Sequence, residues 1–75
     1  MNQSKREVIA IIEPTATGYS AYLPEYPGCY ATARSRDLIK SRLREALLAH
    51  FDALVEAHVT VPAPSSIELS FQDAS

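Results

Sequence analysis

The chain has 75 residues, 47% of them hydrophobic, and a formal net charge of −2 at pH 7. This length predicts one domain, residues 1–75, with a thin core that buries about 60% of the unfolded chain's surface. The apolar content excludes a disordered chain, and no apolar run is long enough to cross a membrane. The lone cysteine excludes an internal disulfide framework. With no apolar segment behind the charged N-terminus, the protein is predicted to be cytoplasmic.

Three short strands are predicted in the first half of the chain. The β-branched apolar run 7–13 indicates a central strand, covered on both faces because nearly every position is apolar. A turn leads to a second strand at 19–23, where apolar and polar residues alternate. Pro24 ends this strand because it has no N–H, and Pro27–Gly28 predicts a turn before a third strand at 29–33. The three strands form an antiparallel meander.

A single long helix is predicted over residues 36–57. Ser35 suits the N-cap because its hydroxyl can accept a bond from an N–H one turn later, and Asp37 complements the helix dipole. Pro62 and Pro64 prevent the helix from continuing. Residues spaced by three and four predict the buried stripe, which consists of Ile39, Leu43, Ala46, Leu47, His50 and Leu54, widened by Leu38, Phe51 and Val55.

A fourth strand is predicted at 67–71, where Ile67, Leu69 and Phe71 alternate with polar residues. The order is then β-β-β-α-β, an α+β fold with a three-stranded antiparallel meander, one further strand and the helix on one sheet face. The crossover through the helix predicts that the last strand runs parallel to a neighbour. Because the other face lacks a helix, that face or a free edge is a natural place for a second subunit or a partner.

No catalytic or metal-binding set can be assembled from this sequence. His50 and His58 lie eight residues apart, with no Cys or carboxylate pair to complete a metal site. Two glycines are too few for a phosphate-binding loop. Cys29 has no neighbouring base, so its expected role is packing. The helix carboxylates line a polar face and form no acid–base pair. We therefore predict no enzymatic activity, no metal and no cofactor.

Two groups of side chains remain for recognition. The segment Arg34–Arg44 carries five of the seven basic side chains, and it is either a solvated helix face or a surface for an acidic partner or nucleic acid. The tyrosines suit core or rim packing first, a protein interface second and base stacking third. Base stacking ranks last because the charged residue among the tyrosines is the acidic Glu25, with no Lys or Arg. They are Tyr19, Tyr22, Tyr26 and Tyr30.

The stretch 18–29 resembles the N-terminal domain of HicB-type antitoxins. The pattern of that family is Gly-Tyr-x-Ala-x-x-Pro-acid-x-Pro-Gly-Cys, followed by a helix with a Thr or Ser cap. Ser35 takes the place of the cap, and Glu45–Ala46 falls where the family often has an acidic-Ala pair. The resemblance spans residues 7–64. The residues that match the pattern are Gly18, Tyr19, Ala21, Pro24, Glu25, Pro27, Gly28 and Cys29.

The resemblance implies a partial RNase H-like fold and a non-catalytic antitoxin that masks a small HicA-type mRNA-cleaving toxin. It also implies a homo-oligomer, a dimer or larger. The tail after residue 71 is too short for the DNA-binding domain that most relatives carry, so we expect a stand-alone domain. The alternative is a small nucleic-acid- or ligand-binding domain that uses Arg34–Arg44. The predicted partner-binding residues are Tyr19, Tyr22, Pro24, Glu25, Tyr26, Arg36, Lys40 and Arg44.

Overall fold

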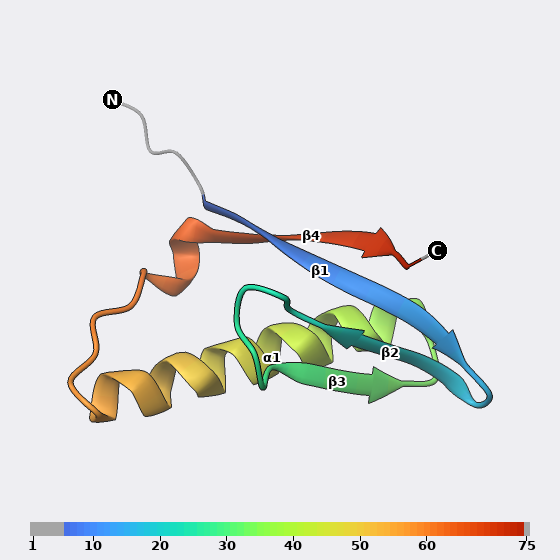
Figure 1. Ribbon diagram of the computed structural model, residues 1–75, viewed down its shortest axis with the longest axis horizontal. Coiled ribbons are helices and arrows are strands. Elements are labelled where there is room, and N and C mark those ends of the chain that lie inside the picture. The colour runs from blue at the N-terminus through green and yellow to red at the C-terminus, as the bar shows by residue number, and fades with distance from the viewer. Residues whose placement is uncertain (1–5, 75) are drawn as a thin grey trace.

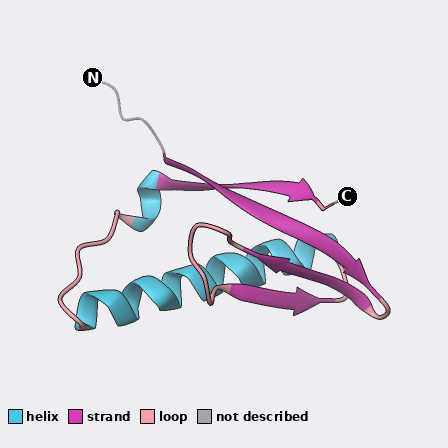
Figure 2. Cartoon of the chain, viewed as in Figure 1, coloured by secondary structure: helices cyan, strands magenta, loops and turns pink. Residues whose placement is uncertain are grey.

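A computed structural model describes residues 6–74 and shows a four-stranded mixed sheet with a long helix on one face (Figure 1). This arrangement confirms the predicted α+β class and the β-β-β-α-β order (Figure 2). A short 3-10 turn, Pro64–Ser66, leads into the last strand. The elements are β1 (Arg6–Thr15), β2 (Gly18–Tyr22), β3 (Tyr30–Ala33), α1 (Arg36–Glu56) and β4 (Ile67–Asp73).

The strands lie in the order β3-β2-β1-β4, so β1 is central and β3 and β4 form the two edges. β1 and β2 are antiparallel, as are β2 and β3, whereas β4 is parallel to β1 as the helical crossover predicts. β1 runs past its predicted end to Thr15 and includes Pro14, which pairs with Tyr19. The β1–β4 pairing ends at Ile12 and Asp73, so no residue of β4 lies beside Pro14. The N–H that Pro14 lacks would therefore have no partner in β4, and its loss breaks no hydrogen bond of the sheet.

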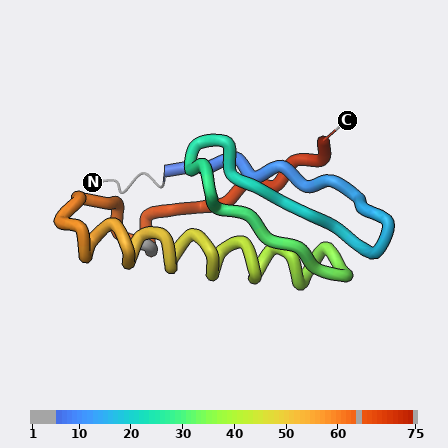
Figure 3. Tube along the Cα trace, turned by 60° about the horizontal axis from the view of Figure 1, so that its bottom comes forward, coloured from blue at the N-terminus to red at the C-terminus, as the bar shows by residue number. Residues whose placement is uncertain are grey.

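Alternate residues of β1 lie on opposite faces of the sheet. Val8, Ala10 and Ile12 face the helix and are fully buried. Ile9 and Ile11 lie on the other face and are only half-buried. The expectation that β1 is covered on both faces was therefore wrong for this chain, because α1 covers one face and leaves the other open (Figure 3).

The helix begins and ends close to the predicted residues. The Ser35 hydroxyl accepts a hydrogen bond from the Leu38 N–H at 3.1 Å, which confirms the predicted cap. Leu38 and Val55, predicted to widen the buried stripe, are instead 41% and 56% exposed. A single sheet meets only a narrow strip of the helix, and side chains beside that strip stay in water. The fully buried side chains of α1 are Ile39, Leu43, Leu47 and Phe51.

The helix is not centred over the sheet. It lies mainly against β3 and β2, while β4 occupies the far side of the sheet (Figure 1). Ala31 and Ala33 of β3 pack against the core, and their small side chains let the helix approach closely. Leu69 and Phe71 of β4 face the same side of the sheet but are only half-buried. Among the described residues, no helix is both long and apolar enough to cross a membrane.

Candidate functional site

The sheet face opposite α1 carries an exposed apolar patch. Tyr30 pairs with Tyr22, and Tyr22 pairs with Ile11, so the three side chains form a row across three strands. Ile9 lies two residues from Ile11 and shares its face. Tyr30 is 70% exposed and Tyr22 is 42% exposed. We call Ile9, Ile11, Tyr22 and Tyr30 the open-face patch. Exposed apolar patches bounded by polar residues commonly mark interaction sites.

Carboxylates border the open-face patch. Glu7 pairs with Glu68 across the parallel β1–β4 ladder, so two exposed carboxylates lie side by side. Glu13 pairs with Ser20 at the other end of the patch. None of the residues that the four described strands place on this face is basic. Like charges directly opposite each other in a sheet are destabilising, so a cation brought by a partner would stabilise this face.

The loop between β2 and β3 is held by its own backbone. Leu23 N–H donates to Cys29 C=O at 3.2 Å, and Cys29 N–H donates to Tyr26 C=O at 3.1 Å. Tyr26 is half-buried and meets the Phe51 ring edge-on, with ring centroids 5.5 Å apart. The loop also presents Glu25, which forms an exposed ion pair with Arg6. The loop is therefore ordered by packing on α1 and offers a charged tip.

The structure confirms the predicted packing role of Cys29. It lies in the core and is 4% exposed. Burial raises the pKa of the Cys29 thiol, which disfavours the nucleophilic thiolate. Within the described part of the chain, no group of three or more His, Cys, Asp or Glu side chains is placed to hold a metal ion.

The basic side chains of α1 point to separate places. Arg36 donates to Asp73 at 2.7 Å, and its guanidinium carbon lies 5.6 Å from the centroid of the Tyr19 ring. The bond to Asp73 raises the pKa of Arg36. The ammonium of Lys40 lies 5.5 Å from the centroid of the Phe71 ring. The helix therefore directs these cations toward β4, away from the open face.

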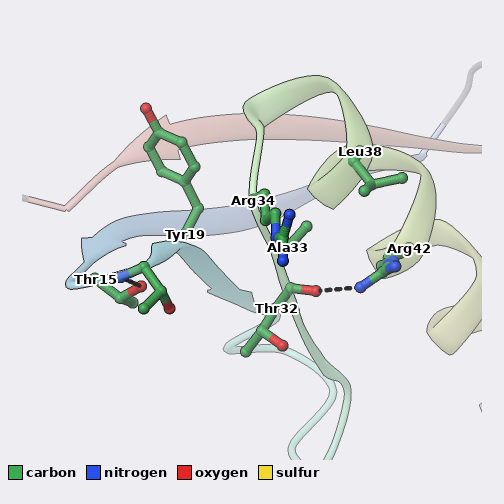
Figure 4. A pocket seen from close by; sticks show the side chains of 8 residues that line it. Thr15, Tyr19, Thr32, Ala33, Arg34, Leu38 and Arg42 are labelled. Carbon is green, nitrogen blue, oxygen red and sulfur yellow. Dashed lines mark hydrogen bonds between the residues drawn. The ribbon is translucent and has the colours of Figure 1, made fainter.

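A second cationic region surrounds a hollow of about 370 Å³ beside the first turn of α1 (Figure 4). Arg42 crosses to β3 and donates to the Thr32 carbonyl at 3.0 Å. None of the eight described residues that line the hollow is acidic, so it has the charge to attract an anion. The lining residues are Thr15, Thr17, Tyr19, Thr32, Ala33, Arg34, Leu38 and Arg42.

The predicted partner-binding residues are spread over three surfaces. Tyr22 lies in the open-face patch, and Pro24 and Glu25 lie on the β2–β3 loop. The other five lie on the helix side: Tyr19, Tyr26, Arg36, Lys40 and Arg44.

Three members of the open-face patch were missed by the sequence prediction: Ile9, Ile11 and Tyr30. Ile9 and Ile11 were assigned to a strand covered on both faces, so they were not considered as surface residues. Tyr30 could have been found from strand pairing, since a hairpin that places Tyr22 opposite Tyr30 sets both rings on one face.

Comparison with known proteins agrees with the predicted family. No curated protein and no solved structure gives a significant match. The family model described as "HicB_like antitoxin of bacterial toxin-antitoxin system" matches residues 8–75, which include all four strands from Val8 onward and the whole helix. The chain therefore belongs to the HicB-like antitoxins of bacterial toxin–antitoxin systems.

Proposed function

We propose that this protein is a non-catalytic antitoxin that binds a small HicA-type mRNA-cleaving toxin and masks its RNA-binding surface. The observation that carries the proposal is the family match over residues 8–75. Such a toxin acts on mRNA, so we propose that the antitoxin works in the cytoplasm. We also propose that it self-associates, because a domain as small as the one described has a thin core.

The open-face patch is the surface we assign to the toxin. A protein that binds RNA needs a positively charged surface to meet the phosphates. The face around Tyr22 and Tyr30 offers aromatic rings at its centre and the carboxylates of Glu7, Glu13 and Glu68 around them. Aromatic anchors with complementary charge at the rim are the usual composition of a protein interface. Occupying the toxin's basic surface would keep RNA away without any chemistry on the antitoxin's part.

Co-expression with a HicA-type toxin tests this proposal. The wild-type protein is expected to restore growth and to co-purify with the toxin. The double variant Glu13→Lys/Tyr30→Lys reverses one charge and removes one ring from the open face, and it is expected to lose both effects. The matched control is Glu56→Lys/Val55→Lys, which also reverses one charge and replaces one exposed apolar side chain with Lys, but on α1, and should behave as wild type. Failure of the wild-type protein to bind the toxin would refute the proposal.

The alternative, binding of nucleic acid or a small anion, is favoured by the hollow that Arg34 and Arg42 line. It predicts binding of RNA or DNA that weakens with salt and with the variant Arg34→Gln/Arg42→Gln. A gel-shift measurement at low ionic strength that shows no binding would remove this alternative.

A further inference from the structure

The outer edge of β4 has backbone groups without a neighbouring strand. β4 pairs with β1 and forms one end of the sheet. Ala74 N–H donates to Ile12 C=O at 2.8 Å, so Ala74 directs its backbone toward β1. Because strand residues alternate in direction, Ser70 and Gln72 also face β1, whereas Leu69 and Phe71 direct their N–H and C=O groups outward. Such an edge is a template for another strand.

Two of the outward-directed residues, Leu69 and Phe71, also have half-buried side chains, whereas Ile67 is buried in the core. Ile67, Leu69 and Phe71 lie on the helix side and form one wall of a groove of about 640 Å³ between β4 and α1. Lys40 and Arg44 are among the residues of the helix wall. The groove exists because α1 leans toward β3 and leaves the β4 side of this face half-exposed. One strand thus presents unpaired backbone groups together with half-buried apolar side chains.

We propose that a second copy of the chain pairs with β4 through its own β4. The two strands run antiparallel about a two-fold axis at Ser70, so that two four-stranded sheets become one continuous sheet. This inference rests on the self-association proposed above and assigns it a surface. It leaves the open-face patches of both copies free, because the new contact is made at an edge.

Full overlap of β4 and the positions of its charges favour one antiparallel register. A two-fold axis at Ser70 overlaps all seven residues of the strand and sets Leu69 opposite the partner's Phe71. Both residues direct their backbone outward, so they can exchange two hydrogen bonds. Glu68 lies opposite the partner's Gln72, and no like charges oppose each other. Shifting the axis to Glu68 would instead set two carboxylates face to face, which is unfavourable.

The groove also complements the incoming strand in polarity and charge. The partner's Phe71 lies beside Leu69, so the two apolar walls cover each other and lose their contact with water. The partner's Asp73 lies opposite Ile67. Its carboxylate accepts a hydrogen bond from Arg36 of its own chain and adds negative charge beside a groove whose helix wall contains Lys40 and Arg44. A second copy therefore supplies backbone partners, apolar cover and a carboxylate to one edge.

Substitutions on the two faces of β4 test the surface. Wild-type protein is expected to be a dimer by light scattering after size-exclusion chromatography. Leu69→Lys places a charge in the apolar contact and is expected to weaken dimerisation by about 100-fold or more. Gln72→Lys adds the same charge to the same strand on the open face, opposite the partner's Glu68, and should remain a dimer.

Cross-linking gives a second test that does not depend on the folding of Leu69→Lys. Ser70 forms the central pair of the register, a type of pair with Cα atoms about 4.5 Å apart, which a disulfide can bridge. Ser70→Cys is therefore expected to give a covalent dimer with an added oxidant such as diamide, which takes up the two electrons and two protons. In Gln72→Cys the two sulfur-bearing residues are offset by four positions, about 14 Å, and should not cross-link.

The outcomes separate the two proposals. If the wild-type protein is monomeric at all concentrations, both self-association and the β4 surface are rejected. The proposal of toxin binding is not affected, because the co-expression experiment tests it separately. A dimer that persists in Leu69→Lys, or a Ser70→Cys variant that cross-links no better than Gln72→Cys, would reject the β4 surface and leave self-association in place. Loss of the dimer in Leu69→Lys alone, with cross-linking in Ser70→Cys alone, supports the β4 pairing.

Discussion

The two edges of the sheet differ in how their backbone is protected. β3 is four residues long, and its outward carbonyl at Thr32 accepts a hydrogen bond from Arg42 of the helix. β4 is seven residues long, and its outward positions carry Leu69 and Phe71 beside a groove. Short strands and charged side chains are recognised ways to prevent edge-to-edge association. The β3 edge has both, so the fold directs strand pairing to the β4 edge.

The position of the helix explains both the hydrogen bond from Arg42 to the β3 edge and the exposure of Leu69 and Phe71 at the β4 edge. Ala31 and Ala33 allow α1 to approach β3 closely, and this brings Arg42 within reach of the Thr32 carbonyl. The same displacement takes α1 away from β4 and leaves Leu69 and Phe71 half-buried. A helix centred over the sheet would cover β4 better but would move Arg42 away from β3. Small residues in one strand therefore determine which edge remains available.

The largest expected effect comes from disturbing the end of β3. A Cβ added at Gly18 would lie 2.3 Å from the Ala33 carbonyl oxygen and 2.8 Å from Arg34 Cα. Because these are backbone atoms, β3 would have to move away from β2. We expect Gly18→Ala to lower the free energy of unfolding by about 3 kcal/mol, as measured by urea denaturation.

Gly28 provides the matched control for this substitution. Its φ is 97°, which residues with a side chain rarely adopt, but among the described residues beyond its two chain neighbours no atom lies within 4 Å of an added Cβ. Gly28→Ala should therefore lose only the cost of the backbone conformation, about 1–2 kcal/mol. Equal losses in the two variants would show that the close approach between Gly18 and β3 does not limit stability.

A smaller effect is expected from removing the protection of the β3 edge. Arg42→Ala leaves the Thr32 carbonyl to water and should lower the free energy of unfolding by about 1 kcal/mol. With two free edges, the protein should form assemblies larger than a dimer in light scattering. Arg34→Ala removes a neighbouring arginine from the same hollow and should leave the assembly state unchanged. If Arg42→Ala stays at the size of the wild type, the difference between the edges has another origin.

Much of the fold could be predicted from local pattern. The Ser35 cap, the breaks at proline and the alternation in 67–71 each reflect a backbone rule that acts over a few residues. The helical crossover predicted that β4 runs parallel to a neighbouring strand, but it did not identify β1 as that neighbour. The strand ends were displaced by one or two residues, because pairing across the sheet, rather than composition, decides where a strand stops.

The surfaces could not be predicted in the same way. Whether Ile9 and Ile11 are covered depends on which face receives the helix, and an unbroken apolar run does not reveal that choice. Leu38 and Val55 were assigned to the core because periodicity gives the direction of a stripe but not its width. The exposure of β4 depends on the lateral position of α1, which results from packing on Ala31 and Ala33.

The smallest expected effect concerns pH and the core behind the protected edge. Cys29 precedes β3, and burial raises the pKa of its thiol. The unfolded chain loses this proton above its ordinary pKa of about 8.5, while the folded chain retains it. The unfolded state then binds fewer protons, so stability is complete below that pH and falls as pH rises through the raised pKa.

Comparison with Cys29→Ala isolates this contribution, because the other titrating groups are shared. Urea denaturation of both proteins from about pH 7 to about pH 10 should show a steeper loss of stability for the wild type. Parallel curves would mean that the thiol ionises equally in the folded and unfolded states. In that case water reaches the Cys29 side chain at the start of β3. The β3 edge would then be protected only by the hydrogen bond from Arg42, and the core beneath it would not be shielded from water.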